Sequence, residues 1–365
     1  MLWTSCSPAS QSNTVDSVRD TAWLNQVQVI GSHNSYKKPI DPDLFAALRP
    51  KMGERLNGLD YEHIPMPDQL TLGLRNLEID VLHDPEGGRY ADPYGLRLLK
   101  QMGKKAAPYD ADRMRKPGLK VLHVQDIDFR SHVYTFKEAL EELKAWSDAH
   151  PDHLPIVITM NAKDSSPKDP NFVQALPFDK AAWDAWDAEI REVLSPSKLI
   201  TPDDVRGSYE TLEAAVLAHN WPTLAESRGK FLFVLDEKGQ KLQSYIEGHP
   251  SLRSRVMFGN APVGTPEAAF LILNEPHEQF KVIQQRVRAG YLVRTRADAE
   301  TKEARTGDRS RMEKAFASGA HVVTTDYYQE DKRFQSGYKV TFPTGGYIRW
   351  NPLTGPAVEN LPALE

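Results

Sequence analysis

Short apolar runs recur along the chain, and the segments between them carry apolar residues at every third or fourth position. The short runs are typical of buried strands, and the intervening spacing is typical of helices that cover one side of a sheet. Strands are expected at 27–30, 76–81, 119–123, 155–160, 230–235, 291–293 and 321–326, with 255–258 and 268–273 competing for one further place. Helices are expected near 43–48, 131–149, 179–194, 209–218, 278–289 and 310–318.

This alternation over about 300 residues predicts a parallel sheet. A count of eight strands favours a (β/α)8 TIM barrel, a single α/β domain with long loops at the C-terminal face of its strands. A doubly wound open sheet is the alternative, but the Gly-rich phosphate turn that usually marks it is missing from the sequence. We expect residues 1–20 to form a flexible tail, 21–335 the barrel, and 336–365 an extension that packs on it.

Composition narrows the class of protein. A net charge of −5 argues against nucleic-acid binding, and no apolar run is long enough to cross a membrane. Cys6 is the single cysteine, which excludes an intramolecular disulfide and a thiolate zinc cluster. Residues 2–6 loosely resemble the end of a bacterial lipoprotein signal, although the apolar segment that should precede them is absent. We therefore expect a monomer that is secreted, periplasmic or lipoprotein-anchored, with an irrelevant terminal cysteine as the plainer alternative.

Polar residues gather where the predicted strands end. Gly31 is expected to end the first strand, and it is followed by His33 and Asn34. Glu78 and Asp80 share one face of the second strand, where two carboxylates repel each other unless a cation lies between them. His123 follows the third strand, as His33 follows the first.

These side chains would meet at one barrel mouth. The oxygens of Asn34, Glu78, Asp80 and Asn161 suit Ca²⁺, with Mg²⁺ as an alternative. Two histidines could remove one proton and return another, while Lys163 and Arg294 hold phosphoryl oxygens. The last expected strand ends at Asp326 and is followed by Tyr327. These two residues complete the predicted substrate-binding set. Such a set suits metal-dependent cleavage of a phosphodiester.

The motifs that carry this chemistry resemble one family. G-S-H-N-S-Y (31–36), L-E-I-D (77–80), the strand-end His123, R-T-R-A-D (294–298) and T-T-D-Y (324–327) are similar to those of bacterial Ca²⁺-dependent phosphatidylinositol-specific phospholipases C. That family belongs to the phospholipase C-like phosphodiesterase superfamily of TIM barrels. The similarity spans about residues 27–330, and the combination of motifs is more specific than any one of them.

The resemblance implies roles for individual residues. His33 and His123 would be the catalytic pair, and Asn34, Glu78 and Asp80 would ligate Ca²⁺. The inositol 2-hydroxyl would attack phosphorus, releasing diacylglycerol and a cyclic inositol phosphate, but which histidine acts as the acid stays open. Asn161 departs from the pattern, because similar enzymes carry a glutamate there; either Asn161 or Asp164 would complete the metal site.

Two other functions stay open from the sequence. A glycerophosphodiester phosphodiesterase would act on a soluble substrate and would not need an inositol hydroxyl. A non-catalytic barrel would bind inositol phosphates or lipid headgroups, although such a protein has no need of two proton carriers. If the substrate is a phosphoinositide, peripheral contact with a membrane follows, but only Lys37, Lys38, Phe45 and Leu48 hint at it.

Overall fold

The computed structural model describes residues 19–357 and 363–365. Cys6 and most of the predicted N-terminal tail lie outside the described residues. Eight parallel strands form a nearly closed barrel in the order β6-β5-β4-β2-β1-β9-β8-β7. Their bounds are β1 Val27–Ser32, β2 Asn76–Leu82, β4 Ile156–Ala162, β5 Phe231–Leu235, β6 Phe258–Gly259, β7 Phe270–Ile272, β8 Leu292–Arg296 and β9 Val322–Thr325. The predicted single-domain (β/α)8 barrel is confirmed.

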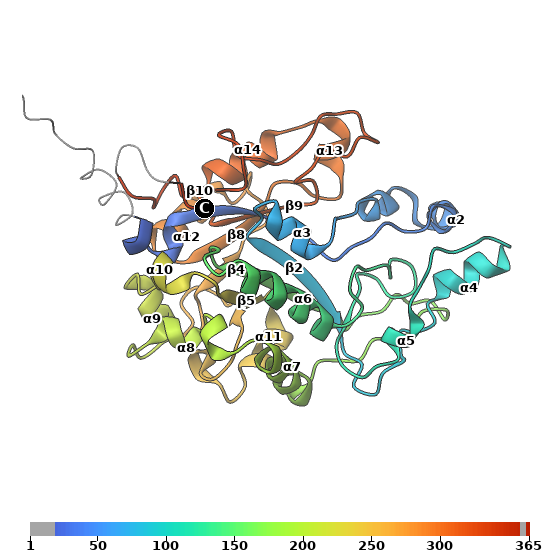
Figure 1. Ribbon diagram of the computed structural model, residues 1–365, viewed down its shortest axis with the longest axis horizontal. Coiled ribbons are helices and arrows are strands. Elements are labelled where there is room, and N and C mark those ends of the chain that lie inside the picture. Colours follow the sequence, from blue (N-terminus) through green and yellow to red (C-terminus); the bar gives the residue numbers. More distant parts are fainter. Residues whose placement is uncertain (1–18, 358–362) are drawn as a thin grey trace, which may run out of the picture.

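Helices lie around this barrel and in a lobe beside it (Figure 1). They are α2 Pro42–Met52, α3 Met66–Thr71, α4 Tyr94–Gln101, α5 Ala111–Met114, α6 Phe136–Ala149, α7 Lys180–Val193, α8 Pro202–Arg206, α9 Leu212–Leu217, α10 Leu224–Ser227, α11 Gly239–Ile246, α12 Phe280–Arg288, α13 Lys302–Thr306 and α14 Ser310–Ala317. Short 3-10 helices occupy Leu24–Gln26, Gly53–Leu59, Pro196–Lys198 and Pro250–Leu252. In the described parts of the chain, no helix combines the length and apolarity that crossing a bilayer requires.

Local sequence explains where the covering helices begin. Thr135 caps α6, since its hydroxyl accepts the backbone N–H of Glu138 while the Glu138 side chain accepts the N–H of Thr135. Asp179 caps α7 in the same way through the N–H of Ala182. Trp183 and Trp186 of α7 are fully buried in the core.

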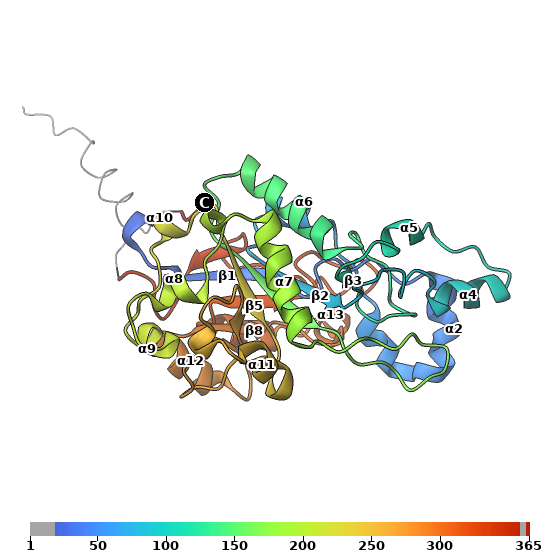
Figure 2. The same cartoon turned by 90° about the horizontal axis from the view of Figure 1, so that it is seen from below.

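Two long connections build a lobe beside the barrel. The β1–β2 connection carries α2, and the β2–β4 connection carries α4 and α5; all three project together from one end of the molecule in both views (Figures 1 and 2). The lobe has its own apolar cluster, which consists of Ile40, Leu44, Leu48, Leu56, Leu99, Ile127 and Phe129. A buried ion pair between Asp41 and Arg130, 2.7 Å apart, joins the two connections.

Three details of the predicted strand pattern are corrected. The segment at 119–123 is not a barrel strand: β3 (Lys120–Val121) runs antiparallel to the end of β2, because β2 and β4 pair directly along six positions and leave no place between them. The segments that competed for one place are both strands, β6 and β7, and so the count still reaches eight. Gly31 does not end β1, which continues to Ser32.

After the barrel, the chain returns across the first strand. β10 (Ile348–Trp350) pairs antiparallel with β1, matching Val27 with Trp350 and Val29 with Ile348. Before it, Tyr338, Val340 and Phe342 are buried against Ile30, Val323 and neighbouring residues in a second apolar cluster. Residues beyond β9 therefore support the strand that delivers His33.

Candidate active site

His33 leaves the C-terminal end of β1 in a tight turn. Asn34, the next residue, has a left-handed backbone (φ 50°), which Asn tolerates better than most side chains. Ser35 fastens the turn to β2: its N–H donates to the carbonyl of Glu78 at 2.9 Å, and its hydroxyl accepts the N–H of Glu78 at 2.7 Å. The Nε2–H of His63 donates to the His33 carbonyl at 2.8 Å. These backbone hydrogen bonds fix the position of His33 independently of the contacts that its ring makes.

A carboxylate and a guanidinium surround the His33 ring. Nδ1 of His33 lies 2.8 Å from Oδ1 of Asp326, which follows β9, the neighbour of β1 in the barrel. Arg296, at the end of β8, lies 3.2 Å from the other oxygen of Asp326 and 3.4–3.5 Å from both ring nitrogens of His33. Burial alone would raise the pKa of Asp326, but the charges of His33 and Arg296 outweigh it, and the pKa is lowered.

A second carboxyl lies directly behind Asp326. Asp298 accepts the N–H of Asp326 at 2.9 Å and contacts the Thr325 hydroxyl, and it is fully buried. Burial and the nearby charge of Asp326 together raise the pKa of Asp298 to about 7. The two acids therefore have different roles. Asp326 stays ionised beside His33, while Asp298 accepts a hydrogen bond from the backbone of Asp326.

His123 is supported by the same kind of arrangement from a different part of the chain. Its Nδ1 lies 2.8 Å from Oδ2 of Asp128, and the other oxygen of Asp128 lies 3.1 Å from the ammonium of Lys37. Burial would raise the pKa of Asp128, but Lys37 and His123 lower it. Each histidine is thus paired with an ionised carboxylate whose second oxygen faces a cation.

The predicted metal ligands lie between these histidines. Asp80 and Asn161 are directly opposite each other on β2 and β4, and Nδ2 of Asn161 donates to Oε1 of Glu78 at 3.1 Å. Burial would raise the pKa of Asp80, but Lys163, His123 and His33 lower it, so both histidines act on this carboxylate. The predicted histidines and oxygen ligands therefore converge on one place.

These donors fit a hard cation. Asn34 donates its Nδ2 hydrogen to the Tyr61 hydroxyl at 2.7 Å, and Asn161 donates to Glu78, so each amide keeps its oxygen for a cation. Across residues 19–357 and 363–365, acids and histidines alone form no group of three that could hold a metal. An ion held here would therefore need the amide oxygens as well. Asp164 instead pairs with Lys241 at 2.9 Å, which favours Asn161 over Asp164 as the fourth ligand.

The predicted cations contact the acids of the site. Lys163 Nζ lies 2.8 Å from Oδ2 of Asp80, and Arg294 pairs with Glu78. Arg294 also reaches Asp236, at the end of β5, at 3.5 Å. Burial raises the pKa of Asp236, and the charge of Arg294 opposes that rise. Each of these two cations is therefore held beside a predicted calcium ligand.

Two predicted substrate-binding residues, Asp326 and Tyr327, line a cavity of about 270 Å³ together with His63 and Tyr328. Asp326 also contacts His33, as described above. Tyr327 is buried, and its ring packs against Phe334 and Tyr338, with centroids 5.9 and 6.2 Å away. Lys37 and Leu48, which had hinted at membrane contact, are also buried.

Sequence reasoning missed several residues of the site. Arg296 could have been found, since alternation along a strand places it on the same face as Arg294. Asp236 could also have been found, because it is a polar residue directly after β5, as the other site residues are at the ends of their strands. Asp128, Lys37 and Tyr61 carry no comparable signal, because they lie in irregular connections whose course periodicity does not predict.

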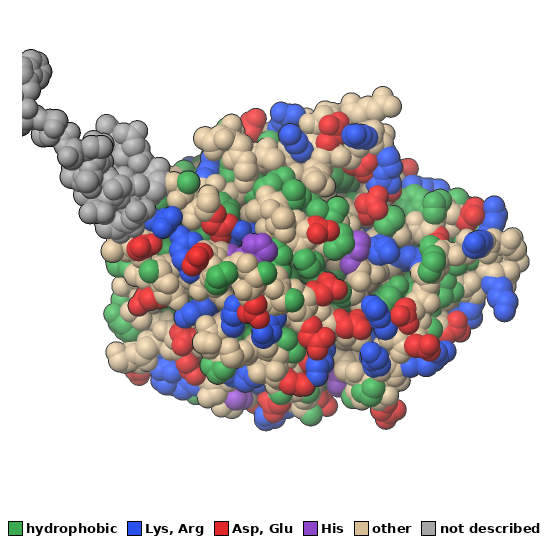
Figure 3. Space-filling model, in the orientation of Figure 1, with side chains coloured by type: hydrophobic (Ala, Val, Ile, Leu, Met, Phe, Trp, Pro, Cys, Tyr) green, Lys and Arg blue, Asp and Glu red, His purple; other side chains and the backbone are tan. Residues whose placement is uncertain are grey.

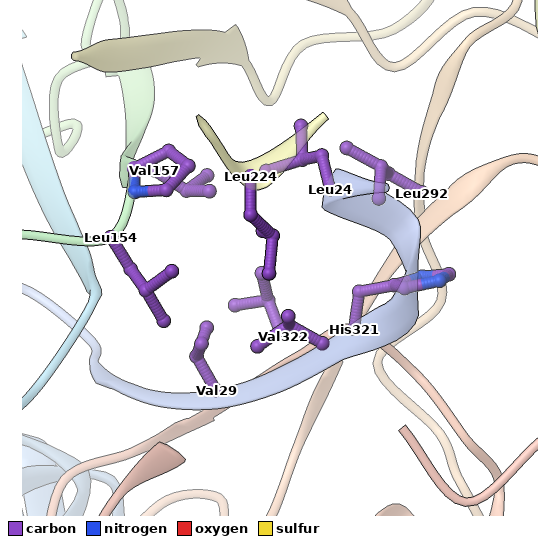
Figure 4. Close-up of a pocket in the computed structure, with 10 residues that line it drawn as sticks. Leu24, Val29, Leu154, Val157, Leu224, Leu292, His321 and Val322 are labelled. Atoms are coloured by element: carbon purple, nitrogen blue, oxygen red, sulfur yellow. The ribbon is translucent and has the colours of Figure 1, made fainter. Parts of the chain in front are cut away.

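The opposite end of the barrel holds an apolar pocket without this chemistry. Its lining includes Leu24, Val29, Leu154, Val157, Leu224, Leu292 and Val322, and His321 is its polar exception (Figure 4). Nε2 of His321 lies 3.0 Å from the Asn25 carbonyl, and its Nδ1 accepts the N–H of Val293 at 3.1 Å. Burial lowers the pKa of His321 to about 4, so this histidine is neutral and structural.

Two carboxylate-backed histidines beside an oxygen-rich cluster, at the C-terminal face of a parallel barrel, define a phosphodiesterase of the phospholipase C class. The sequence profile described as phosphoinositide phospholipase C, Ca²⁺-dependent, matches residues 23–352. The chain belongs to this family, and its cofactor is Ca²⁺.

Solved structures with the same fold agree with that assignment. A calcium-dependent phosphoinositol-specific phospholipase C from Pseudomonas sp is 17% identical with a TM-score of 0.54, and the alignment covers 95% of this chain and 100% of that one. A Ca²⁺-dependent phosphatidylinositol-specific phospholipase C from Streptomyces antibioticus is 18% identical with a TM-score of 0.51, over 84% and 95% of the two chains. No curated protein sequence matches this chain significantly.

Proposed function

We propose that this enzyme cleaves phosphatidylinositol through His33 and His123. The observation that carries the proposal is the pair of 2.8 Å contacts that join each Nδ1 to a buried carboxylate, since they orient both rings and make Nε2 the nitrogen for proton transfer. The Pseudomonas protein of similar fold is a myo-inositol complex, which supports an inositol-bearing substrate.

In the proposed reaction, the inositol 2-hydroxyl oxygen bonds to phosphorus and the bond from phosphorus to the glycerol oxygen breaks. One histidine takes the hydroxyl proton, and the other gives a proton to the departing diacylglycerol oxygen. The products are diacylglycerol and a cyclic inositol phosphate, which water can open by the reverse roles.

The surroundings of the His33 ring are mixed in charge. Nε2 of His33 lies 3.5 Å from the guanidinium of Arg296 and 3.6 Å from Oε1 of Glu78. A cation and a carboxylate therefore both face this nitrogen, and the comparison of leaving groups below assigns the base and the acid.

Asn34, Glu78, Asp80 and Asn161 would hold the Ca²⁺. When bound, the ion supplies positive charge that favours ionisation of the hydroxyl and stabilises charge on the phosphoryl oxygens. Lys163 and Arg294, already directed at these acids, are placed to hold non-bridging oxygens of the phosphate. Asp326 orients His33 and is not proposed to touch the substrate.

We further propose that the lobe meets the lipid surface. Met102 is 41% exposed just after α4, and Lys100 and Lys105 beside it are exposed without an ion-pair partner among the described residues. Lys and Arg side chains are visible at the outer end of the lobe (Figure 3). We also propose that the enzyme works outside the cytosol, a proposal supported by the loose resemblance of residues 2–6 to a lipoprotein signal.

Leaving-group chemistry tests the proposed roles. His33→Ala and His123→Ala should each lower kcat on phosphatidylinositol by about 10²–10⁴-fold, since both remove a proton carrier. On p-nitrophenyl inositol phosphate, the variant that lacks the acid should recover most of its activity, because p-nitrophenolate leaves without protonation. The variant that lacks the base should stay impaired. Circular dichroism and calcium titration would establish that both variants remain folded. Full activity in both variants on the lipid would refute the proposal.

A further inference from the structure

Lys37 is a buried cation that the reaction described above does not use. It directly follows the G-S-H-N-S-Y segment, and its side chain is fully buried. Its ammonium lies 3.1 Å from Oδ1 of Asp128 and donates to the Tyr61 carbonyl at 3.0 Å. A buried ammonium is costly unless it is paired and hydrogen-bonded, and these contacts satisfy that requirement.

The carboxylate that Lys37 contacts is the one that orients His123. Oδ1 of Asp128 faces Lys37 while Oδ2 faces Nδ1 of His123. A carboxylate held at both oxygens cannot turn about its bond to Cβ without losing one contact. Because His123 lies in an irregular connection rather than on a barrel strand, its ring depends on this carboxylate for its orientation.

Lys37 also contacts the support of the other histidine. Its ammonium lies over the Tyr61 ring, 4.8 Å from the centroid, in addition to its bond to the Tyr61 carbonyl. The Tyr61 hydroxyl accepts a hydrogen bond from Asn34 at 2.7 Å and lies 3.4 Å from Nδ1 of His33. Lys37 thus contacts one residue on each side of the site.

We propose that Lys37 is a positioning residue that fixes Asp128 against His123 and Tyr61 against His33 and Asn34, so that one buried charge sets the geometry of both proton carriers. The inference rests on the proposed roles of the two histidines. It adds a residue that touches neither substrate nor metal and acts through Asp128 and Tyr61. A purely structural ion pair would stabilise the fold without changing the properties of His123.

The direct test is the NMR signal of the His123 Nδ1–H proton, identified by comparison with His123→Ala. Lys37→Met should shift this signal, because Asp128 is then held at one oxygen only and its contact with Nδ1 of His123 changes. The groups facing this pair are Asp80 beside His123, and Tyr36, Tyr61 and His63 around Lys37 and Asp128. Asp128→Asn should shift the same signal, because it removes the carboxylate that Nδ1 faces.

The double variant Lys37→Met with Asp128→Asn isolates the coupling and avoids a lone buried charge if Lys37→Met does not fold. In the Asp128→Asn background, removal of Lys37 should leave the Nδ1–H signal of His123 nearly unchanged. Kinetics form the second readout: Lys37→Met should lower kcat about tenfold with little change in KM, and Lys37→Arg should restore most of it.

Two results would overturn the inference. One is an unchanged Nδ1–H signal of His123 in folded Lys37→Met, and the other is an equal effect of Lys37 removal with and without Asp128. Both readings are made on the protein without substrate. If the enzyme proved to act on a different ester, this NMR signal would still report on Lys37, and so failure of the proposed function and failure of this inference are separable.

Discussion

At the scale of single residues, the site contains the same arrangement of histidine, carboxylate and cation twice, built from different parts of the chain. His33 with Asp326 and Arg296, and His123 with Asp128 and Lys37, each place an ionised carboxylate between an imidazole and a cation. The carboxylate fixes the ring tautomer, and the cation keeps the carboxylate ionised despite burial. The arrangement therefore orients both rings before substrate arrives.

In the proposed ligand set, Asn161 leaves the calcium site with two carboxylates, those of Glu78 and Asp80. Asn161→Glu would add a third carboxylate beside Glu78 and Asp80, which lie on the neighbouring strand. Since added negative charge strengthens the attraction for a divalent ion, Ca²⁺ should bind at least about tenfold more tightly. Isothermal titration calorimetry would measure this, with Asn161→Gln as the control that keeps an amide.

The same substitution should weaken the calcium-free protein. Like charges would then lie where Asn161 now donates a hydrogen bond to Glu78. The expected signature is a lower Tm in EGTA together with a larger rise in Tm on adding calcium. An unchanged Kd for Ca²⁺ would show that Asn161 is not at the ion site.

Much of the residue set could be predicted from the sequence, because strand ends point to one face of a barrel. His33, Asn34, Glu78, Asp80, Asn161, Lys163 and Arg294 all follow from strand position. Asp128, Lys37 and Tyr61 could not be predicted, because no periodicity reports which loop residues meet in space. The site residues remain predictions of function even where the structure brings them together.

At the scale of elements, the barrel depends on the close approach of β1 and β2. Gly31 lies opposite Asn76, and a Cβ at Gly31 would lie 2.4 Å from the Cβ of Asn76. Glycine at this position therefore allows the two strands to pair. Sequence reasoning treated Gly31 as a strand end, because glycine usually marks a turn, and the tertiary contact outweighs that tendency.

Gly31→Ala should consequently destabilise the protein by about 1–3 kcal/mol, the usual cost of overpacking. The measurement is urea-induced unfolding. Gly58→Ala is a matched control, because its new Cβ would meet Glu300 at an ordinary 3.8 Å and its backbone φ is not positive. Equal stability of the Gly31 variant and the control would contradict the close packing of β1 and β2.

The misplaced third strand has a physical reason of the same kind. The apolar run at 119–123 has the composition of a barrel strand, and Val121 and Leu122 are indeed fully buried. It pairs with the end of β2 in the opposite direction, because β4 already occupies the neighbouring barrel position. Composition predicted a strand, but only topology decides its direction.

At the scale of the whole molecule, the alternating pattern was sufficient to predict the barrel, whereas the lobe was not predictable as a unit. On the face shown in Figure 3, acidic and basic side chains are interspersed, consistent with the small net charge of −5. The lobe forms its own apolar cluster from residues far apart in sequence, such as Leu44, Leu99 and Phe129. Such contacts leave no local signal.

Acid should destabilise the fold through its buried histidines. Because the pKa of His321 is lowered from its usual 6.5 to about 4, the unfolded chain binds a proton that the folded chain does not between these values. Stability is complete above pH 6.5 and decreases as pH falls towards 4, with about 3 kcal/mol from His321 alone.

His321→Gln tests this assignment, since glutamine can still donate to the Asn25 carbonyl but does not titrate. Between pH 6.5 and 4, the free energy of unfolding of the variant should decline less steeply with pH than that of the unmodified protein. The difference in slope should correspond to at most one bound proton. Urea unfolding at several pH values gives both curves. Parallel curves would show that His321 is not the group responsible.

The central claim is that the barrel mouth cleaves an inositol phospholipid with Ca²⁺. Phosphorus NMR of the purified protein with phosphatidylinositol micelles, first with calcium and then with EGTA, tests it most directly. The account predicts a cyclic phosphodiester signal that appears with calcium and stops with EGTA. Three results would contradict it: turnover that continues in EGTA, glycerol phosphate as the product, or no turnover in either condition.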